Sequence, residues 1–209
     1  MISLIKMRKT IFTALLGLVA LTALGQKIKR VTESVEDCMD HMSLYGYKVF
    51  AYDISSLRDS VSSATIVIRE YNQQGMIGEK KLYGFRTRST TSGLSKTLSI
   101  GFSPVTSDSV ETITLRTANN DYCLWNLTLK PIPNAPQAFY LYKKVPYQPG
   151  PFQRDTFIPL VFYGSFWWDE AINNWCFCEE EELADEKAKL SNPSRDSPHY
   201  YIIGAIFHQ

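Results

Sequence analysis

The sequence predicts a mostly β protein, an antiparallel β-sandwich with a short N-terminal helix and a short helix near the C-terminus. Three observations predict this fold class. Apolar and polar residues alternate with a period of two in many short segments between Tyr47 and Phe207. Turn-forming residues separate these segments at short intervals, as they do in antiparallel sheets. Proline clusters at 131–136 and 146–151 interrupt the pattern, which suits sandwich edges because proline cannot donate to a strand ladder.

The chain begins with the features of a secretory signal peptide over residues 1–25. Three basic residues come first, at Lys6, Arg8 and Lys9. An apolar run of 13 residues follows at 11–23, and the small residue Gly25 precedes the expected new N-terminus at Gln26. The run is short for a membrane-spanning helix, which needs about 20 apolar residues. We therefore expect cleavage and export, with an uncleaved N-terminal anchor as the alternative.

Signal removal would leave residues 26–209, which is the length of a single domain. The signal carries three basic residues and no acidic ones, so its loss changes the formal net charge from +1 to −2. This balance provides no basic stripe for a nucleic acid. No cysteine stands at the cleavage point, since Cys38 is the first in the chain, so we do not expect a lipoprotein. We expect a periplasmic or extracellular protein without a transmembrane segment.

The first element expected after the signal is a helix over residues 32–45. Its apolar residues recur at helical spacing, at Val35, Cys38, Met39 and Met42. Gly46 can adopt the left-handed conformation that ends a helix. A second, polar helix is expected at 179–190, where four acidic residues lie at the end that the helix dipole favours.

Ten strands are expected between and after these helices. They lie at 47–52, 64–71, 80–88, 97–102, 110–116, 122–130, 138–145, 157–168, 175–178 and 199–207. The strands 157–168 and 175–178 are expected to pair with each other. The last strand is very apolar, which indicates a central position in its sheet.

Four cysteines, Cys38, Cys123, Cys176 and Cys178, are candidates for disulfides, because an exported chain folds where disulfides form. The alternative is that their thiols are small buried apolar groups. A zinc site would need ligands such as Cys38, His41, Cys176 and Cys178, but their spacing does not favour tetrahedral coordination. We predict no metal and no cofactor.

No motif in the chain predicts catalysis. Gly164-Ser165-Phe166 begins like the nucleophile elbow of a hydrolase, but Trp168 stands where its closing glycine should be. No glycine-rich phosphate loop is present. We predict no catalytic residues, and a hydrolase with an unrecognised site is the least favoured of three functional alternatives.

The aromatic segment 166–175 is the most informative part of the chain, because it holds three of the four tryptophans. Consecutive strand residues point to opposite faces, so either Trp167 or Trp168 should face outward unless something covers it. An outward tryptophan would serve as an anchor for a protein partner or as a platform for a sugar. The alternative is that both are buried. The predicted ligand-binding residues are Trp167, Trp168, Trp175, Asp169, Asn173 and Asn174.

The chain resembles the small exported proteins of unknown function that are common in gut bacteria of the bacteroidete type. The resemblance lies in the end of the signal at Leu24-Gly25-Gln26 and in the aromatic, β-rich body. This general resemblance implies export and no particular activity. The sequence therefore predicts an exported, non-catalytic binding or assembly module with a protein partner, or alternatively a carbohydrate-binding module with a polysaccharide partner.

Overall fold

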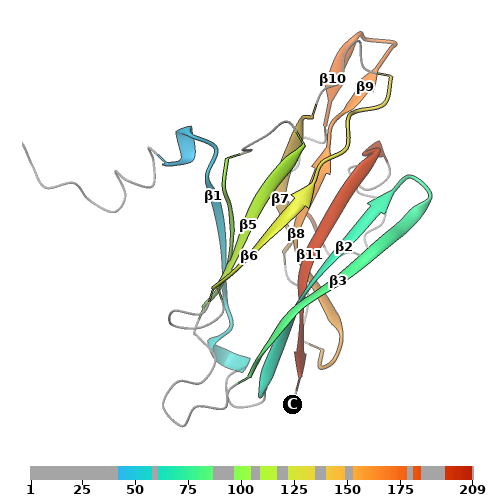
Figure 1. Cartoon of the computed structure of the whole chain (residues 1–209). Coiled ribbons are helices and arrows are strands. Elements are labelled where there is room, and N and C mark those ends of the chain that lie inside the picture. The colour runs from blue at the N-terminus through green and yellow to red at the C-terminus, as the bar shows by residue number, and fades with distance from the viewer. Residues whose placement is uncertain are drawn as a thin grey trace, which may run out of the picture. The chain divides into compact units, whose positions relative to one another are not determined.

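Two antiparallel β-sheets and a separate two-stranded hairpin make up the computed structural model of the chain (Figure 1). The structure describes residues 42–57, 61–86, 97–104, 109–116, 122–134, 140–148, 153–177, 181–184 and 196–208. The predicted signal peptide, Cys38, His41 and Cys178 lie outside these residues. No helix among the described residues is long and apolar enough to cross a membrane.

The first sheet has four strands in the order β1-β4-β5-β6. Their bounds are β1 Lys48–Asp53, β4 Thr97–Phe102, β5 Val110–Arg116 and β6 Tyr122–Thr128. A single 3₁₀ turn, η1, follows β1 at Ser55–Leu57. The predicted strands at 97–102 and 110–116 are confirmed with the same bounds.

The second sheet has five strands in the order β3-β2-β11-β8-β7. Their bounds are β3 Gly75–Arg86, β2 Ser63–Asn72, β11 His199–His208, β8 Phe157–Ser165 and β7 Tyr142–Pro146. The central position predicted for the last strand is confirmed, because β11 pairs with β2 on one side and β8 on the other. Its first seven residues are all buried.

The main core lies between the two sheets. Strand alternation turns one face of each sheet inward. Ile100 and Phe102 of β4 and Ile113 of β5 meet Val161 of β8 and Ile203 of β11, all of them almost fully buried. Shared core residues from both sheets make this a sandwich.

A second, smaller core covers the outer face of the five-stranded sheet. It consists of Val145, Tyr147, Phe162, Leu183, Tyr200 and Ile202. Leu183 is 1% exposed, and its segment pairs with Tyr147 as a parallel bridge. The Leu183 N–H donates to the Pro146 carbonyl at 2.9 Å, while the Gln148 N–H donates to the Leu183 carbonyl at 2.8 Å.

This pairing corrects the helix predicted at 179–190. Residues 181–184 are not helical, because burial of Leu183 against the sheet draws the backbone into an extended bridge. The acidic residues at 179–182 carried the helix prediction, and the buried side chain of Leu183 decides the structure instead. Residues 185–190 lie outside the described part of the chain.

The N-terminal helix predicted at 32–45 is not confirmed either. Of its residues the structure describes 42–45, and of these Met42–Leu44 are helical. Gly46 ends this turn with a φ of +86°, as the sequence predicted, and its N–H donates to the Ser43 carbonyl at 2.9 Å. Residues 32–41 lie outside the described part.

The predicted pairing of 157–168 with 175–178 is confirmed at its turn end, where Trp167 and Trp168 pair with Cys176 and Trp175, but residues 157–165 pair elsewhere. The strand β8 ends at Ser165, where it pairs with β7 and β11. The Phe166 N–H donates to the Leu141 carbonyl at 2.9 Å, which extends the β7–β8 ladder by one position. The chain then starts a separate hairpin, in which β9 (Trp167–Asp169) pairs with β10 (Asn174–Cys176).

Tyrosine hydroxyls connect the two sheets across the core. The Tyr52 hydroxyl of β1 donates to the Leu160 carbonyl of β8, and the Tyr201 hydroxyl of β11 donates to the Thr128 carbonyl of β6 at 2.7 Å. The Tyr163 hydroxyl of β8 donates to the buried carboxylate of Glu111 in β5. Burial raises the pKa of each of these hydroxyls, so they remain protonated donors at neutral pH.

An ion pair completes this interior link. The Lys144 Nζ of β7 lies 2.5 Å from Glu111 Oε1, and the Glu111 side chain is fully buried. The ammonium also lies over the ring of Phe102, 5.2 Å from its centroid. The fold tolerates a buried carboxylate that has a charge partner and a hydroxyl donor, whereas a buried carboxylate that has lost its charge partner destabilises the folded state.

We predict that Lys144→Met lowers the free energy of unfolding by about 3–5 kcal/mol, because it leaves the Glu111 carboxylate buried without a counter-charge. The double variant Glu111→Gln with Lys144→Met should recover most of this loss, since the amide oxygen still accepts from Tyr163. Urea unfolding of the two variants measures the difference. A double variant as unstable as the single one would contradict the ion-pair argument.

Candidate functional site

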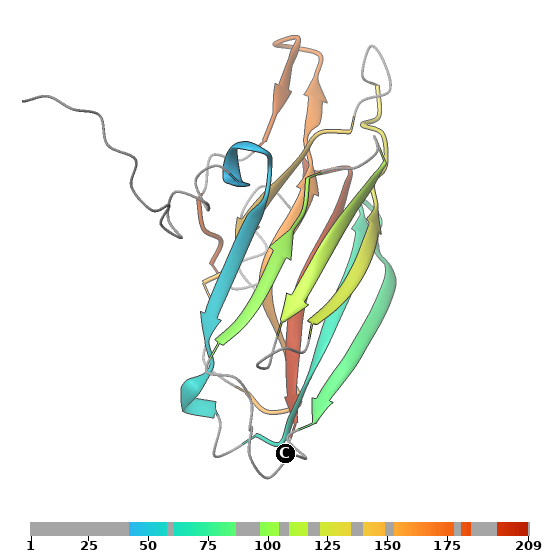
Figure 2. The same ribbon diagram turned by 60° about the vertical axis from the view of Figure 1, so that its left-hand side comes forward.

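All six residues that the sequence predicted as ligand-binding lie on the β9–β10 hairpin and its turn, within the segment 166–177 that we call the aromatic arm. Among the described strands, its two strands pair only with each other. In Figures 1 and 2 the arm extends beyond the ends of the other strands. The structure therefore brings the predicted residues together.

The pairing register divides these residues between the two faces of the arm. Trp168 lies opposite Trp175, and their rings meet edge to face at 4.8 Å and 70°. Asp169 lies opposite Asn174, one position along, and so shares the other face with Trp167. All three tryptophans are partly exposed. The alternative that Trp167 and Trp168 are both buried is not what the structure shows.

Phe177 anchors the base of the arm. Its ring contacts Phe166 at 4.9 Å, Trp167 at 6.2 Å and Phe162 of the second core at 6.3 Å. The Lys143 ammonium lies over the same ring, 5.1 Å from its centroid. These contacts hold the arm to the outer face of the five-stranded sheet.

Polar groups of the arm shape its turn. Asp169 Oδ1 accepts from the Ala171 N–H at 2.9 Å, and Asn174 Oδ1 accepts from the Trp175 N–H at 2.8 Å. Asn173 adopts a φ of +50°, the left-handed conformation that asparagine tolerates in turns. Ile172 at the tip is 62% exposed.

Two of the predicted disulfide candidates fall within the described residues. Cys123 of β6 and Cys176 of β10 carry free thiols. Cys38 and Cys178 lie outside the described residues. Within the described part of the chain, no group of three or more His, Cys, Asp or Glu side chains could hold a metal ion.

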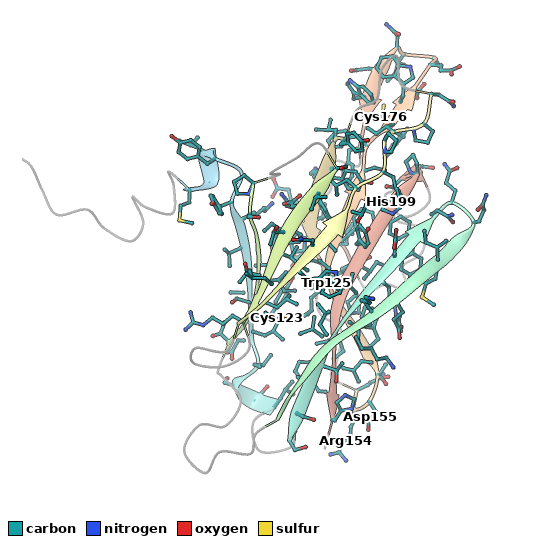
Figure 3. The ribbon with its side chains drawn as sticks, viewed as in Figure 1. Cys123, Trp125, Arg154, Asp155, Cys176 and His199 are labelled. Carbon is teal, nitrogen blue, oxygen red and sulfur yellow. The ribbon has the colours of Figure 1, made fainter. Side chains whose placement is uncertain are left out.

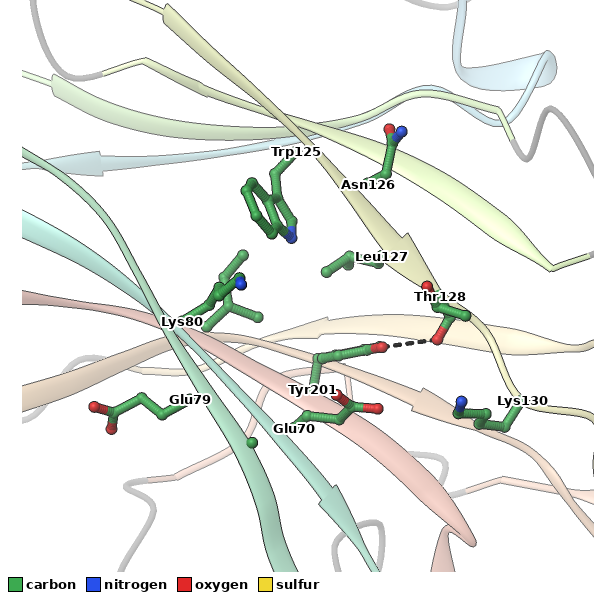
Figure 4. A pocket seen from close by; sticks show the side chains of 11 residues that line it. Glu70, Glu79, Lys80, Trp125, Asn126, Leu127, Thr128, Lys130 and Tyr201 are labelled. Carbon is green, nitrogen blue, oxygen red and sulfur yellow. Dashed lines mark hydrogen bonds between the residues drawn. The ribbon is translucent and has the colours of Figure 1, made fainter.

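A second candidate site, which sequence reasoning missed, is a groove of about 410 Å³. We call it the β3–β6 groove, because those two edge strands form its sides (Figure 4). Its polar and aromatic lining includes Glu70, Glu79, Lys80, Trp125, Lys130 and Tyr201. Figure 3 shows Trp125 in the sandwich near this groove, well away from Cys176 on the arm.

A buried polar network supports the groove from behind. His199 Nε2 lies 2.9 Å from Glu70 Oε1, and His199 Nδ1 lies 2.7 Å from the Tyr142 hydroxyl. The Lys130 N–H donates to the same hydroxyl oxygen at 2.9 Å. Because Glu70 and His199 are 129 residues apart, no local spacing could relate them. The sequence feature that could have indicated this site is Glu70, a charged residue on the same strand face as the apolar residues Ile66 and Ile68.

Residues 19–209 match the family described as a domain of unknown function, DUF5041. The chain belongs to this family. No curated protein and no solved structure matches it.

The network of this DUF5041 domain fixes the tautomer of His199. The Tyr142 hydroxyl accepts from the Lys130 N–H, and it donates to the nearer of its two acceptors, His199 Nδ1 at 2.7 Å rather than the Lys130 carbonyl at 3.3 Å. The Glu70 carboxylate on the other side of the ring can only accept. The proton of the ring therefore resides on Nε2, which donates to Glu70. Burial lowers the pKa of His199, although the neighbouring Glu70 acts in the opposite direction. His199 is thus a neutral link between Tyr142 and Glu70 at neutral pH.

We predict that the DUF5041 domain loses stability as the pH falls below 6.5, the ordinary pKa of histidine. The unfolded chain binds a proton at His199 there, whereas the folded chain resists it until a lower pH, so protonation favours unfolding. Urea unfolding between pH 7.5 and 5.5 should show this slope for the natural sequence and a smaller slope for His199→Gln.

His208→Gln is the control, because it changes the other described histidine and should keep the slope. The interpretation fails if His199→Gln keeps the slope and His208→Gln removes it.

Proposed function

We propose that this chain is an exported, non-catalytic binding module whose aromatic arm contacts a protein partner. The observation that carries the proposal is the arm itself: a hairpin with three partly exposed tryptophans and an exposed Ile172, anchored at its base. The family match leaves the activity open.

The chemistry of the arm suits a protein interface. Tryptophan is among the residue types that contribute most to binding energy, especially when a partner buries it fully. The Trp168–Trp175 contact and the Phe177 anchor restrain these side chains before binding. Binding then costs less conformational entropy than it would on an unrestrained loop.

The same geometry argues against a sugar platform on the arm. A platform needs an aromatic face with hydrogen-bonding groups beside it. Asp169 and Asn174 lie on the face opposite the Trp168–Trp175 pair, and Trp167, which shares their face, packs against Phe177. One carboxylate oxygen of Asp169 and the amide oxygen of Asn174 also accept from the backbone of the arm. A protein partner, which can contact both faces of the hairpin, fits better.

A hydrolase is the weaker proposal. The network nearest to a catalytic arrangement among the described residues is Glu70–His199–Tyr142, in which the Tyr142 hydroxyl is also bonded to the Lys130 backbone. Burial also raises the pKa of the Tyr142 hydroxyl, which opposes its use as a nucleophile.

We predict that a photo-crosslinking amino acid at Ile172 forms a discrete protein adduct in the envelope of cells that naturally produce the chain. The adduct should be lost when Trp168→Ala and Trp175→Ala are added, because these changes remove the edge-to-face pair. Immunoblotting of the full chain after illumination measures the adduct.

The matched control places the same crosslinker at Ile77, which is 53% exposed on the β2–β3 hairpin. Equal adducts from positions 77 and 172 would indicate nonspecific contact. The absence of an adduct at 172 would also count against a protein partner for the arm.

A further inference from the structure

We propose that the β3–β6 groove binds a neutral hydroxylated ring, such as one pyranose unit of a glycan. This site is separate from the aromatic arm and does not depend on the protein contact proposed for it. The groove has a volume of about 410 Å³, within the range of about 300–1,000 Å³ that is typical of small-ligand pockets.

The groove exists because β6 crosses the five-stranded sheet obliquely. Trp125 of β6 meets Lys80 of β3, Thr128 meets Tyr201 of β11, and Lys130 beyond the strand end meets Tyr142 of β7. A strand that crosses in this way diverges from the edge strand β3. The opening between them is lined from both sheets, as Figure 4 shows.

The charges that line the groove favour a ligand with both donors and acceptors. Glu70 supplies a carboxylate, and Lys80 and Lys130 supply two ammonium groups, whereas the Glu79 carboxylate is paired with Arg69. The groove therefore holds charges of both signs, and a ligand of either charge would meet a group of like charge. Hydroxyl groups both donate and accept, and they match such a lining best.

Glu70 is a preorganised acceptor for one of those hydroxyls. His199 Nε2 donates to Glu70 Oε1 at 2.9 Å, which fixes the carboxylate from its buried side. The Glu70 side chain is still 30% exposed, so the carboxylate also reaches the groove. Because the tautomer of His199 is set by Tyr142, the carboxylate needs no rearrangement before it accepts from a ligand.

Tyr201 and Lys130 complete the polar end of the groove. The Tyr201 hydroxyl donates a hydrogen bond to the Thr128 carbonyl, so its oxygen can still accept a hydrogen bond from a ligand. The Lys130 ammonium is a donor beside it. A ring with neighbouring hydroxyls can use all of these groups together.

Trp125 provides the apolar end. It is partly buried in the core, and the Lys80 ammonium lies 5.4 Å from its ring centroid. Lys80 is exposed, and a cation–π contact at an exposed site is weak. A sugar ring can therefore displace the ammonium at small cost and stack its C–H face on the indole.

The test is an NMR titration of the full mature chain with selective ¹⁵N labelling of the tryptophan indoles. The neutral probes are glucose, galactose, mannose and xylose with their disaccharides, and the charged probes are glucuronic acid and glucosamine. At least one neutral sugar should shift the Trp125 indole signal saturably, and Trp125→Phe identifies that signal.

Glu70→Gln should weaken this binding at least tenfold, because an amide keeps the bond from His199 but is a poorer acceptor for a hydroxyl. Trp168→Ala on the arm should leave it unchanged, which separates this site from the proposed protein contact. Binding of the charged sugars alone, no saturable shift with any neutral sugar, or full binding by Glu70→Gln would each overturn the proposal.

Discussion

The constraint on which this sandwich depends is that tyrosine hydroxyls buried between the sheets must find acceptors on the opposite sheet. An unpaired buried hydroxyl costs about 1–3 kcal/mol, so sheet positions that break these bonds are penalised. Tyr52, Tyr163 and Tyr201 each reach across to a different strand. Apolar packing holds the sheets together, but it tolerates sliding far better than these directional contacts do. The tyrosines therefore fix how one sheet lies over the other.

Both candidate sites follow from that fixed arrangement. Tyr201 and Tyr142 hold the end of β6 over the middle and far edge of the five-stranded sheet, and the β3–β6 groove opens at the near edge. The arm begins where β8 ends, at Ser165. There the Ser197 hydroxyl donates to the Ser165 carbonyl at 2.8 Å, and the His199 N–H donates to the Ser165 hydroxyl at 3.2 Å. These buried hydrogen bonds take the place of backbone ladder bonds at the end of β8, so the chain leaves the sheet there and enters the hairpin.

The sequence predicted the parts of the fold that depend on local alternation. The strands 97–102 and 110–116 are confirmed, because buried and more exposed residues alternate there. The central position of the last strand is confirmed, because its continuous apolar run is buried between β2 and β8. The helix at 179–190 failed over 181–184 because one long-range contact, Leu183 with Tyr147, outweighs local preference. The predicted arm residues came together because they are neighbours in sequence, whereas the groove joins Glu70, Trp125 and Lys130 from separate strands, which periodicity alone cannot relate.

The buried charged groups of this protein are better explained by a role in positioning the two sheets than by a catalytic role. A buried ion pair adds little stability relative to apolar residues of the same size, yet a mispositioned one is costly. Glu111 with Lys144 therefore penalises alternative positions of the sheets more than it stabilises the observed one. The neutral His199 acts in the same way, because Tyr142, Lys130 and Glu70 must all be in place to satisfy it. A polar interior of this kind provides a rigid frame, and rigidity is what a binding groove and an anchored arm require of their scaffold.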